Sequence, residues 1–293
     1  MLNWWEEPNS HVLAPRDLAR PAQGTWLGVT KQGRIAVLTN YLQDVGTNVY
    51  GQKSRGSIVK GFLGLPPDST ITTEQYIDDL FASGDAFGAG GFSLVCGRVN
   101  EPLAVVSNQI PSEKRYSWIG KEKGKTVGLS NTAFEDRSWK KVTDGEELVT
   151  IAIKESVKAA ETEDALIQRL LRVLSTDTLP RLGDDVGFDS YVKQLRNSIF
   201  NPVIGYKEEA QRAEFMSQYA GLLPTDRVSR NDDSIDEFFM QSFATGLYGT
   251  RQQSVILVTE AGRVRYFERT LFDDAKAGPI ADGDRSFEFN IDT

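Results

Sequence analysis

Apolar and polar residues alternate along the chain in two blocks that predict antiparallel β structure. Two apolar runs, 25–29 and 34–39, flank a turn at Gly33 and predict a β-hairpin. A second hairpin is predicted at 253–259 and 263–268, around a turn that contains Gly262. Further short strands, separated by Gly, Pro or Asn, are predicted at 92–96, 103–107, 116–119 and 126–129, and regular structure is expected again at 238–244.

Helical spacing of apolar residues appears between the strand blocks. Thr72 and Gln75 form a capping-box pattern, which predicts a helix that ends at Gly84. Further helices are predicted at 57–65, 146–160 and 162–175. Because strand blocks flank a central helix pair without strict β-α-β alternation, the pattern favours the α+β class.

Two segments show no sustained periodicity. The first, before residue 25, contains two Trp, several acidic residues and three Pro, and predicts a loop that crosses a protein surface. The second, 181–236, is interpreted as an insertion with a local helix near 207–220. The whole chain, 1–293, is then expected to form a single domain with this insertion inside it.

Composition narrows the function classes. The 293 residues carry a formal net charge of −8, which argues against nucleic acid as a partner. The longest purely aliphatic run is far shorter than the ~20 residues that cross a bilayer, so no integral membrane segment is expected. The N-terminus lacks the basic and apolar regions of a signal peptide, which favours a cytoplasmic location. Because Cys96 and His11 are the only residues of their kinds, neither an intrachain disulfide nor a Cys/His metal site is predicted.

Three polar residues lie at predicted strand ends, where a sheet gathers the groups of a binding site. They are Asn40, Asn131 and Arg251. Two amides and a guanidinium suit a carbonyl or carboxylate ligand through directed hydrogen bonds. The alternative reading of each is a turn-forming Asn or a structural Arg.

Other candidate sites have simpler structural explanations. The Gly-rich stretch 83–91 is interpreted as the entry loop of a strand, because a phosphate-binding loop would open a helix. Lysines between 121 and 141, and the acidic pairs 184–185, 232–233 and 273–274, are expected to be solvated. Cys96 is expected to be a small buried hydrophobe with a raised pKa. A Ser-His-Asp triad would have to use His11, in the Pro-rich loop, and is not predicted.

Several ordered motifs together resemble one known family. The chain resembles the NRDE family, which contains the transport and Golgi organization protein 2 homologues, over nearly its whole length outside 181–236. The motifs that carry the resemblance are Gly24-Thr25-Trp26-Leu27-Gly28, Leu38-Thr39-Asn40-Tyr41, Ser54-Arg55-Gly56, Gly91-Phe92-Ser93-Leu94, Gly128-Leu129-Ser130-Asn131 with Ser138-Trp139-Lys140-Lys141, and Tyr248-Gly249-Thr250-Arg251 with Phe267-Glu268-Arg269.

The resemblance implies a fold and a set of site residues. The family is similar to Cys-dependent N-terminal-nucleophile hydrolases, which implies a four-layer αββα sandwich. By motif position, Asn40 and Asn131 would donate to an oxyanion, Arg251 would be a distal guanidinium and Arg55 a supporting residue. The family's Met-Cys start and Asn-Arg-Asp-Glu signature lie upstream of the tract that resembles 2–5. We therefore expect a truncated gene model that lacks the first strand, the adjacent hairpin and the nucleophile, and so has no amidase activity.

The resemblance also implies cellular roles. Family members are associated with Golgi organisation, protein secretion, and the handling of haem and of lipid or acyl-CoA, which predicts a non-catalytic role and a Golgi or mitochondrial association. Only His11 and Cys96 are strong haem-ligand candidates, and both have simpler explanations. One alternative is an amide or thioester hydrolase whose Cys nucleophile lies upstream of this sequence. Another is an adaptor that uses 181–236 as its partner surface.

Overall fold

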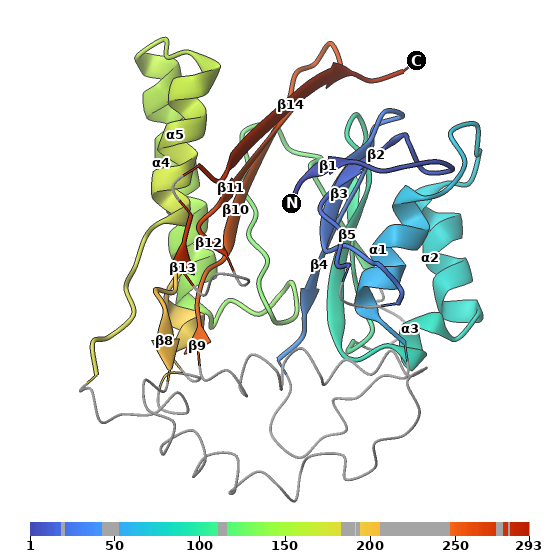
Figure 1. Cartoon of the computed structure of the whole chain (residues 1–293), viewed down its shortest axis with the longest axis horizontal. Helices are drawn as coiled ribbons and strands as arrows, with labels where there is room; N and C mark the ends of the chain where they lie inside the picture. Colours follow the sequence, from blue (N-terminus) through green and yellow to red (C-terminus); the bar gives the residue numbers. More distant parts are fainter. Residues whose placement is uncertain are drawn as a thin grey trace, which may run out of the picture.

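The described part of the chain forms four layers, in the order helices, sheet, sheet, helices (Figure 1). The computed structural model describes residues 1–18, 21–42, 53–110, 116–182, 191, 194–205, 247–273, 278–280 and 282–292. This arrangement confirms the α+β class. The likeness to N-terminal-nucleophile hydrolases, the missing strand and hairpin, and the single-domain assignment stay predictions.

The larger sheet is a seven-stranded antiparallel meander in which each strand pairs with its neighbours in sequence. The predicted hairpin is confirmed, with Gly33 in the left-handed conformation (φ +76°) at its turn. The strands of the larger sheet are β1 (Asn3–Trp4), β2 (Val12–Ala14), β3 (Leu27–Thr30), β4 (Arg34–Asn40), β5 (Phe92–Arg98), β6 (Leu103–Ser107) and β7 (Tyr116–Ile119).

The predicted N-terminal loop is wrong, because this segment forms strands β1 and β2 at the edge of the larger sheet. Leu2, Val12 and Leu13 are fully buried, and the Trp5 indole donates to the carbonyl of Ala14 at 3.0 Å. Strands of two and three residues are too short to show the alternation that identifies a strand in sequence. Tertiary burial therefore decides their conformation.

Helices α1 (Arg55–Leu63), α2 (Thr73–Ala82) and α3 (Asp85–Gly88) lie against the outer face of the larger sheet (Figure 1). The capping box is confirmed: the Gln75 backbone N–H donates to Thr72 Oγ1 at 3.2 Å, and the Thr72 N–H donates to Gln75 Oε1 at 2.9 Å. Apolar side chains of α1 and α2 pack on the face of β4 and β5 that carries Leu94 and Cys96. The Gly-rich stretch 83–91 enters β5 as predicted, with α3 as an added short helix.

The smaller sheet contains three antiparallel strands, β10 (Gln252–Val258), β11 (Arg263–Thr270) and β14 (Asp284–Asn290). The pairing of β10 with β11 confirms the second predicted hairpin. On the outer face of this sheet lies α5 (Glu163–Leu174), with Ile167 and Leu171 packed on Val255 and Phe267. Helix α4 (Lys140–Lys158) packs against α5. Helix α4 begins at Lys140, earlier than the predicted start at Glu146.

The inner faces of the two sheets meet in an apolar layer. Leu13 and Val29 from the larger sheet contact Val264 and Tyr266 from the smaller one. Each strand therefore contributes alternate residues to a helix-facing core and to the layer between the sheets.

Most of the predicted insertion lies outside the described residues, as do the helix predicted at 207–220, the regular structure expected at 238–244 and the acidic pairs 184–185 and 232–233. Four short strands are described near these segments: β8 (Ile204–Gly205) pairs with β9 (Leu247–Tyr248), and β12 (Phe272–Asp273) with β13 (Gly278–Pro279). Within the described ranges, no helix combines the length and the apolar character needed to cross a membrane.

Candidate functional site

Asn40 and Asn131, which the sequence singled out separately, meet at the end of strand β4. The Asn131 side chain donates from Nδ2 to the carbonyl of Asn40 at 2.9 Å, and the Asn131 carbonyl accepts from the N–H of Leu42 at 2.7 Å. Asn40 also pairs with Phe92 at the start of β5. The side-chain amide of Asn131 thus lies against the backbone at the end of β4.

Residues 126–129 were predicted to be a strand, and this prediction is wrong. The neighbouring backbone is instead held by hydroxyl groups on the inner face of the larger sheet. Thr39 Oγ1 donates to the Ser130 carbonyl at 2.9 Å, and Ser93 Oγ donates to the Thr132 carbonyl at 3.1 Å. Because side chains satisfy these carbonyls, the segment needs no neighbouring strand to hold it beside Asn40.

Arg55 joins this group from the first turn of α1. The residue is buried, and its Nη1 donates to the carbonyl of Gly91 at 3.1 Å. The same carbonyl accepts from the N–H of Tyr41 at 2.8 Å, so the guanidinium lies one residue beyond Asn40. Two amides and a buried cation therefore lie near the same end of the central strands β4 and β5.

The buried oxygen Oδ1 of Asn40 has no hydrogen-bond partner in the part of the chain that the structure describes. A buried polar atom without a partner costs about 1–3 kcal/mol, so native structures pair most of them. A ligand that donates a hydrogen bond at this point would offset that cost.

Arg251 is carried by the other sheet. It precedes β10, its side chain is exposed, and its carbonyl accepts from the N–H of Leu271 at 2.8 Å. The hydrogen bonds that unite Asn40, Arg55 and Asn131 do not include Arg251. In Figure 1, the C-terminal end of β4 and the N-terminal end of β10 lie toward the same side of the molecule. A role for Arg251 in this group stays a prediction.

The sequence interpretation missed Glu268, a carboxylate buried between the sheets with 1% of its surface exposed. Its Oε1 accepts from the N–H of Leu2 at 2.9 Å and from Nε2 of Gln252 at 3.4 Å. Burial, and secondarily the charge of Glu268, raises the pKa of the Tyr266 hydroxyl. The signal was present in the alternation of β11, where Val264, Tyr266 and Glu268 share one face.

Cys96 and His11, the two strongest candidates for haem ligation, are both part of the protein core. Cys96 is fully buried, and burial raises the pKa of its thiol to about 12, as the sequence predicted. His11 is also buried, and its Nε2 lies 3.2 Å from the carbonyl of Leu63. In the described ranges, no group of three or more His, Cys, Asp or Glu residues is arranged to hold a metal ion. These residues do not fit a haem site.

The lysines between 121 and 141 follow the predicted pattern, with one exception. Lys121, Lys123, Lys125 and Lys140 are exposed, as expected of solvated residues. Lys141 is half-buried beside the Trp139 ring, 5.2 Å from its centre, and burial lowers the pKa of its amine to about 8. This burial follows from the start of α4 at Lys140, which turns Lys141 into the protein.

We call Asn40, Arg55 and Asn131 together the strand-end group. The sequence that forms this group and this fold also matches known protein sequences. A sequence model of the family Transport and Golgi organisation 2 matches residues 1–273, and the chain belongs to this family. The resemblance to this group of proteins is thereby confirmed.

Individual relatives agree with the family assignment. The chain is 29% identical over 267 residues to the Transport and Golgi organization protein 2 homolog of Bos taurus, covering 90% of this chain and 78% of that protein. It is 27% identical over 270 residues to the human homolog and 25% identical over 266 residues to the Mus musculus homolog. Each of these two matches covers 90% of this chain and 79% of the relative.

Proposed function

We propose that this protein serves Golgi organisation and protein secretion as a non-catalytic binding protein for a hydrophobic small molecule with a polar head, such as an acyl-CoA. The names of its relatives support the cellular part of this proposal. The molecular part rests on the strand-end group of Asn40, Arg55 and Asn131. A cytoplasmic location with Golgi or mitochondrial association belongs to the same proposal.

The observation that carries the proposal is the unpartnered oxygen Oδ1 of Asn40, beside a buried guanidinium. A ligand amide could donate to this oxygen, and the cation of Arg55 suits an anionic head. We favour acyl-CoA over haem because His11 and Cys96 are committed to the core.

Titration of the purified chain with palmitoyl-CoA, followed by tryptophan fluorescence, tests this proposal. We expect saturable binding that Asn40→Ala weakens by about tenfold, the usual effect of losing one or two buried hydrogen bonds. Asn100→Ala, at the exposed turn between β5 and β6, is the matched control and should bind normally. Equal losses in the two variants, or no saturable binding to the parent chain, would refute the proposal.

A second candidate function is hydrolysis of an amide or thioester. The order of the four layers and the meeting of Asn40 with Asn131 favour it, since two amides suit an oxyanion. Cys96 cannot be the nucleophile, because it is fully buried with a pKa of about 12. The nucleophile would therefore have to come from outside this sequence.

A panel of acyl-amides and acyl-thioesters separates the two functions. The binding proposal predicts that palmitoyl-CoA is recovered intact after incubation with the chain. Turnover above background that Asn131→Ala abolishes would instead favour the hydrolase. Turnover that survives Asn131→Ala would exclude this residue from an oxyanion role.

A further inference from the structure

Lys141, the second residue of α4, places its amine where an ammonium group is poorly solvated. The residue is half-buried beside the Trp139 ring, with Nζ 5.2 Å from the ring centre. Within the described ranges, this amine forms no ion pair and donates no hydrogen bond to an oxygen. An ammonium group has three donors, so its partial burial without an acceptor is costly.

The neighbouring lysine, Lys140, is different. It is exposed and forms an ion pair with Asp144, one turn further along α4. The two lysines share the first turn of one helix, yet only the amine of Lys141 is partly withdrawn from water without a carboxylate beside it. The contrast follows from their directions on the helix, since adjacent residues of a helix point about 100° apart.

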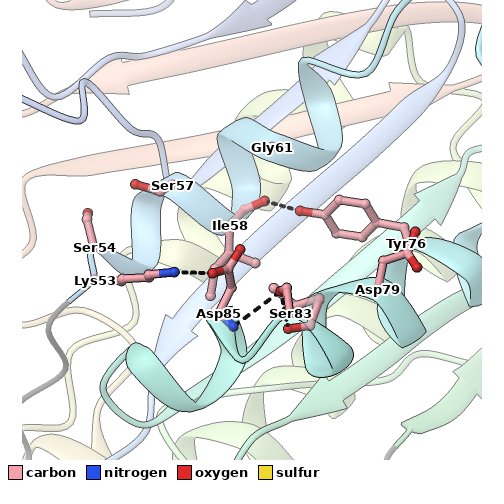
Figure 2. A pocket seen from close by; sticks show the side chains of 10 residues that line it. Lys53, Ser54, Ser57, Ile58, Gly61, Tyr76, Asp79, Ser83 and Asp85 are labelled. Carbon is pink, nitrogen blue, oxygen red and sulfur yellow. Dashed lines mark hydrogen bonds and ion pairs between the residues drawn. The ribbon is translucent and has the colours of Figure 1, made fainter.

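Two lysines on the other side of the molecule also have oxygen partners. Lys60 is half-buried like Lys141, but its Nζ donates to the carbonyl of Ala22 at 2.8 Å. Lys53 lines a cleft of about 390 Å³ between α1 and α2, where it pairs with Asp85 (Figure 2). Partial burial of a lysine in this protein is therefore compatible with a satisfied amine, and Lys141 departs from that pattern.

The N-terminal end of α4 disfavours the charged form further. The first N–H groups of a helix carry a partial positive charge, and the first turn of α4 contains no acidic residue that would offset it. Burial lowers the pKa of the Lys141 amine to about 8, so part of the population is neutral near pH 7.5. A neutral amine has a free lone pair and acts as a nucleophile.

The amine of Lys141 is also within reach of small solutes. The residue is half-buried and not fully enclosed, and Nζ is not one of the buried atoms that solvent cannot reach. A partly desolvated, accessible amine without a counter-ion is the form in which lysine attacks a carbonyl carbon.

We propose that Lys141 captures a small neutral aldehyde as an imine. The lone pair of Nζ attacks the carbonyl carbon to form a C–N bond, and one proton passes from nitrogen to the carbonyl oxygen. The new hydroxyl group then leaves as water with the second amine proton, and a C=N bond remains. The atoms balance without an oxidant or a reductant.

The surroundings of Lys141 favour this product and this class of ligand. An imine is a weaker base than the amine from which it forms, so capture removes the uncompensated charge from a half-buried position. The formal net charge of −8 and the apolar Trp139 ring disfavour a carbonyl compound that carries a carboxylate. The strand-end group takes no part, so this proposal is independent of palmitoyl-CoA binding.

Reductive trapping of the full chain with propanal and cyanoborohydride tests the proposal, because reduction converts the imine into a stable secondary amine. At pH 7.5 the lowered pKa gives Lys141 about 200-fold more free amine than an ordinary lysine. Lower basicity and restricted access offset much of this gain, so we expect modification about tenfold faster at Lys141 than at Lys140. Peptide mass spectrometry with fragmentation distinguishes the two lysines.

Lys140 is the matched control, because it lies in the same turn but is exposed and paired. Unfolding in urea removes the burial and should bring the two rates to within about twofold of each other. Lys141→Arg should remove the fast site and Lys140→Arg should leave it, with circular dichroism to confirm folding. Equal rates in the native chain, or an advantage that persists in urea, would overturn the proposal.

Glyoxylate, an aldehyde that carries a carboxylate, tests the class of ligand. For each compound, the rate at Lys141 is divided by the rate at Lys140, which removes differences in intrinsic reactivity. We expect this ratio to be at least about threefold higher for propanal, because burial of a carboxylate is costly. An equal or higher ratio for glyoxylate would overturn the assignment to neutral aldehydes. Since no acyl-CoA is present, failure here leaves the binding proposal untouched.

Discussion

The two faces of the seven-stranded sheet differ in what their side chains do. The outer face is mainly an apolar core, in which Leu94 and Cys96 pack beneath α1 and α2. Buried Arg34 is its charged residue at the start of β4, where it donates hydrogen bonds to the backbone that follows α1. The inner face is apolar only where Val29 meets the smaller sheet, and it carries the hydroxyls of Thr39 and Ser93 near the strand ends. The outer face therefore contributes mainly to the stability of the fold. On the inner face, some residues pack against the smaller sheet and others hold the backbone beside Asn131 in position.

The largest expected effect is on the outer face. Leu94→Ala removes a fully buried side chain from the core, and we expect it to lower the free energy of unfolding by about 2–5 kcal/mol. Urea unfolding followed by circular dichroism measures this loss. Val258→Ala, at a partly exposed position of β10, should cost much less; equal costs would contradict the contrast between core and surface.

The second largest loss of stability is expected from changes at Glu268, whose side chain hydrogen-bonds the smaller sheet to Leu2. Glu268→Ala leaves the buried N–H of Leu2 without its acceptor and should cost about 1–3 kcal/mol of unfolding free energy. Glu268→Gln keeps an acceptor oxygen and should cost less. If the two variants lose the same stability in urea unfolding, the hydrogen bond is not the source of the effect.

Cys96 gives the outer face a pH dependence. Burial raises the pKa of its thiol from 9.0 to about 12, so above pH 9 the unfolded chain releases a proton that the folded chain retains. This group's contribution is complete below pH 9, and stability should fall above it by up to about 1.4 kcal/mol per pH unit. Urea unfolding at pH 8 and pH 10 should show a smaller fall for Cys96→Ala than for the parent chain. An unchanged difference between the two pH values would refute this assignment.

The smallest effect is expected on the inner face. Thr39→Val keeps the shape of the side chain but removes the hydrogen bond to the Ser130 carbonyl, at a cost of about 1 kcal/mol. The loss of binding free energy for palmitoyl-CoA should exceed the loss of unfolding free energy, because the segment that carries Asn131 is held less firmly. Thr143→Val, at a half-buried position on α4, removes a hydrogen bond at the surface to the Lys140 carbonyl and should leave binding unchanged. A variant with normal binding and reduced stability would assign Thr39 to packing alone.

The sequence predicted the elements whose local signals are strong. Both hairpins carry a Gly at the turn, and the capping box of α2 is satisfied by residues three positions apart. Strands β1 and β2 were missed because their pairing is decided by burial of Leu2 and Leu13 at long range. The strand predicted at 126–129 failed because sheet hydroxyls hold the adjoining backbone without a strand partner.

The candidate site was predictable only in part. The strand-end position of Asn40 was visible from the pattern. Asn131 was selected as the end of a strand that does not form, yet the structure joins it to Asn40 by a hydrogen bond. Arg55 came from the family resemblance alone, since its link through the Gly91 carbonyl depends on a contact between distant segments.

The hydrogen bond between Leu2 and Glu268 also has a consequence for biosynthesis. It joins residues 266 positions apart, so the contact cannot close until a ribosome has released nearly the whole chain. Contacts of such long sequence separation slow folding, and domains of this size often pass through populated intermediates. Until the smaller sheet is synthesised, the apolar residues of the larger sheet that face it stay partly uncovered. Chaperones have the greatest opportunity to act on the nascent chain during that interval.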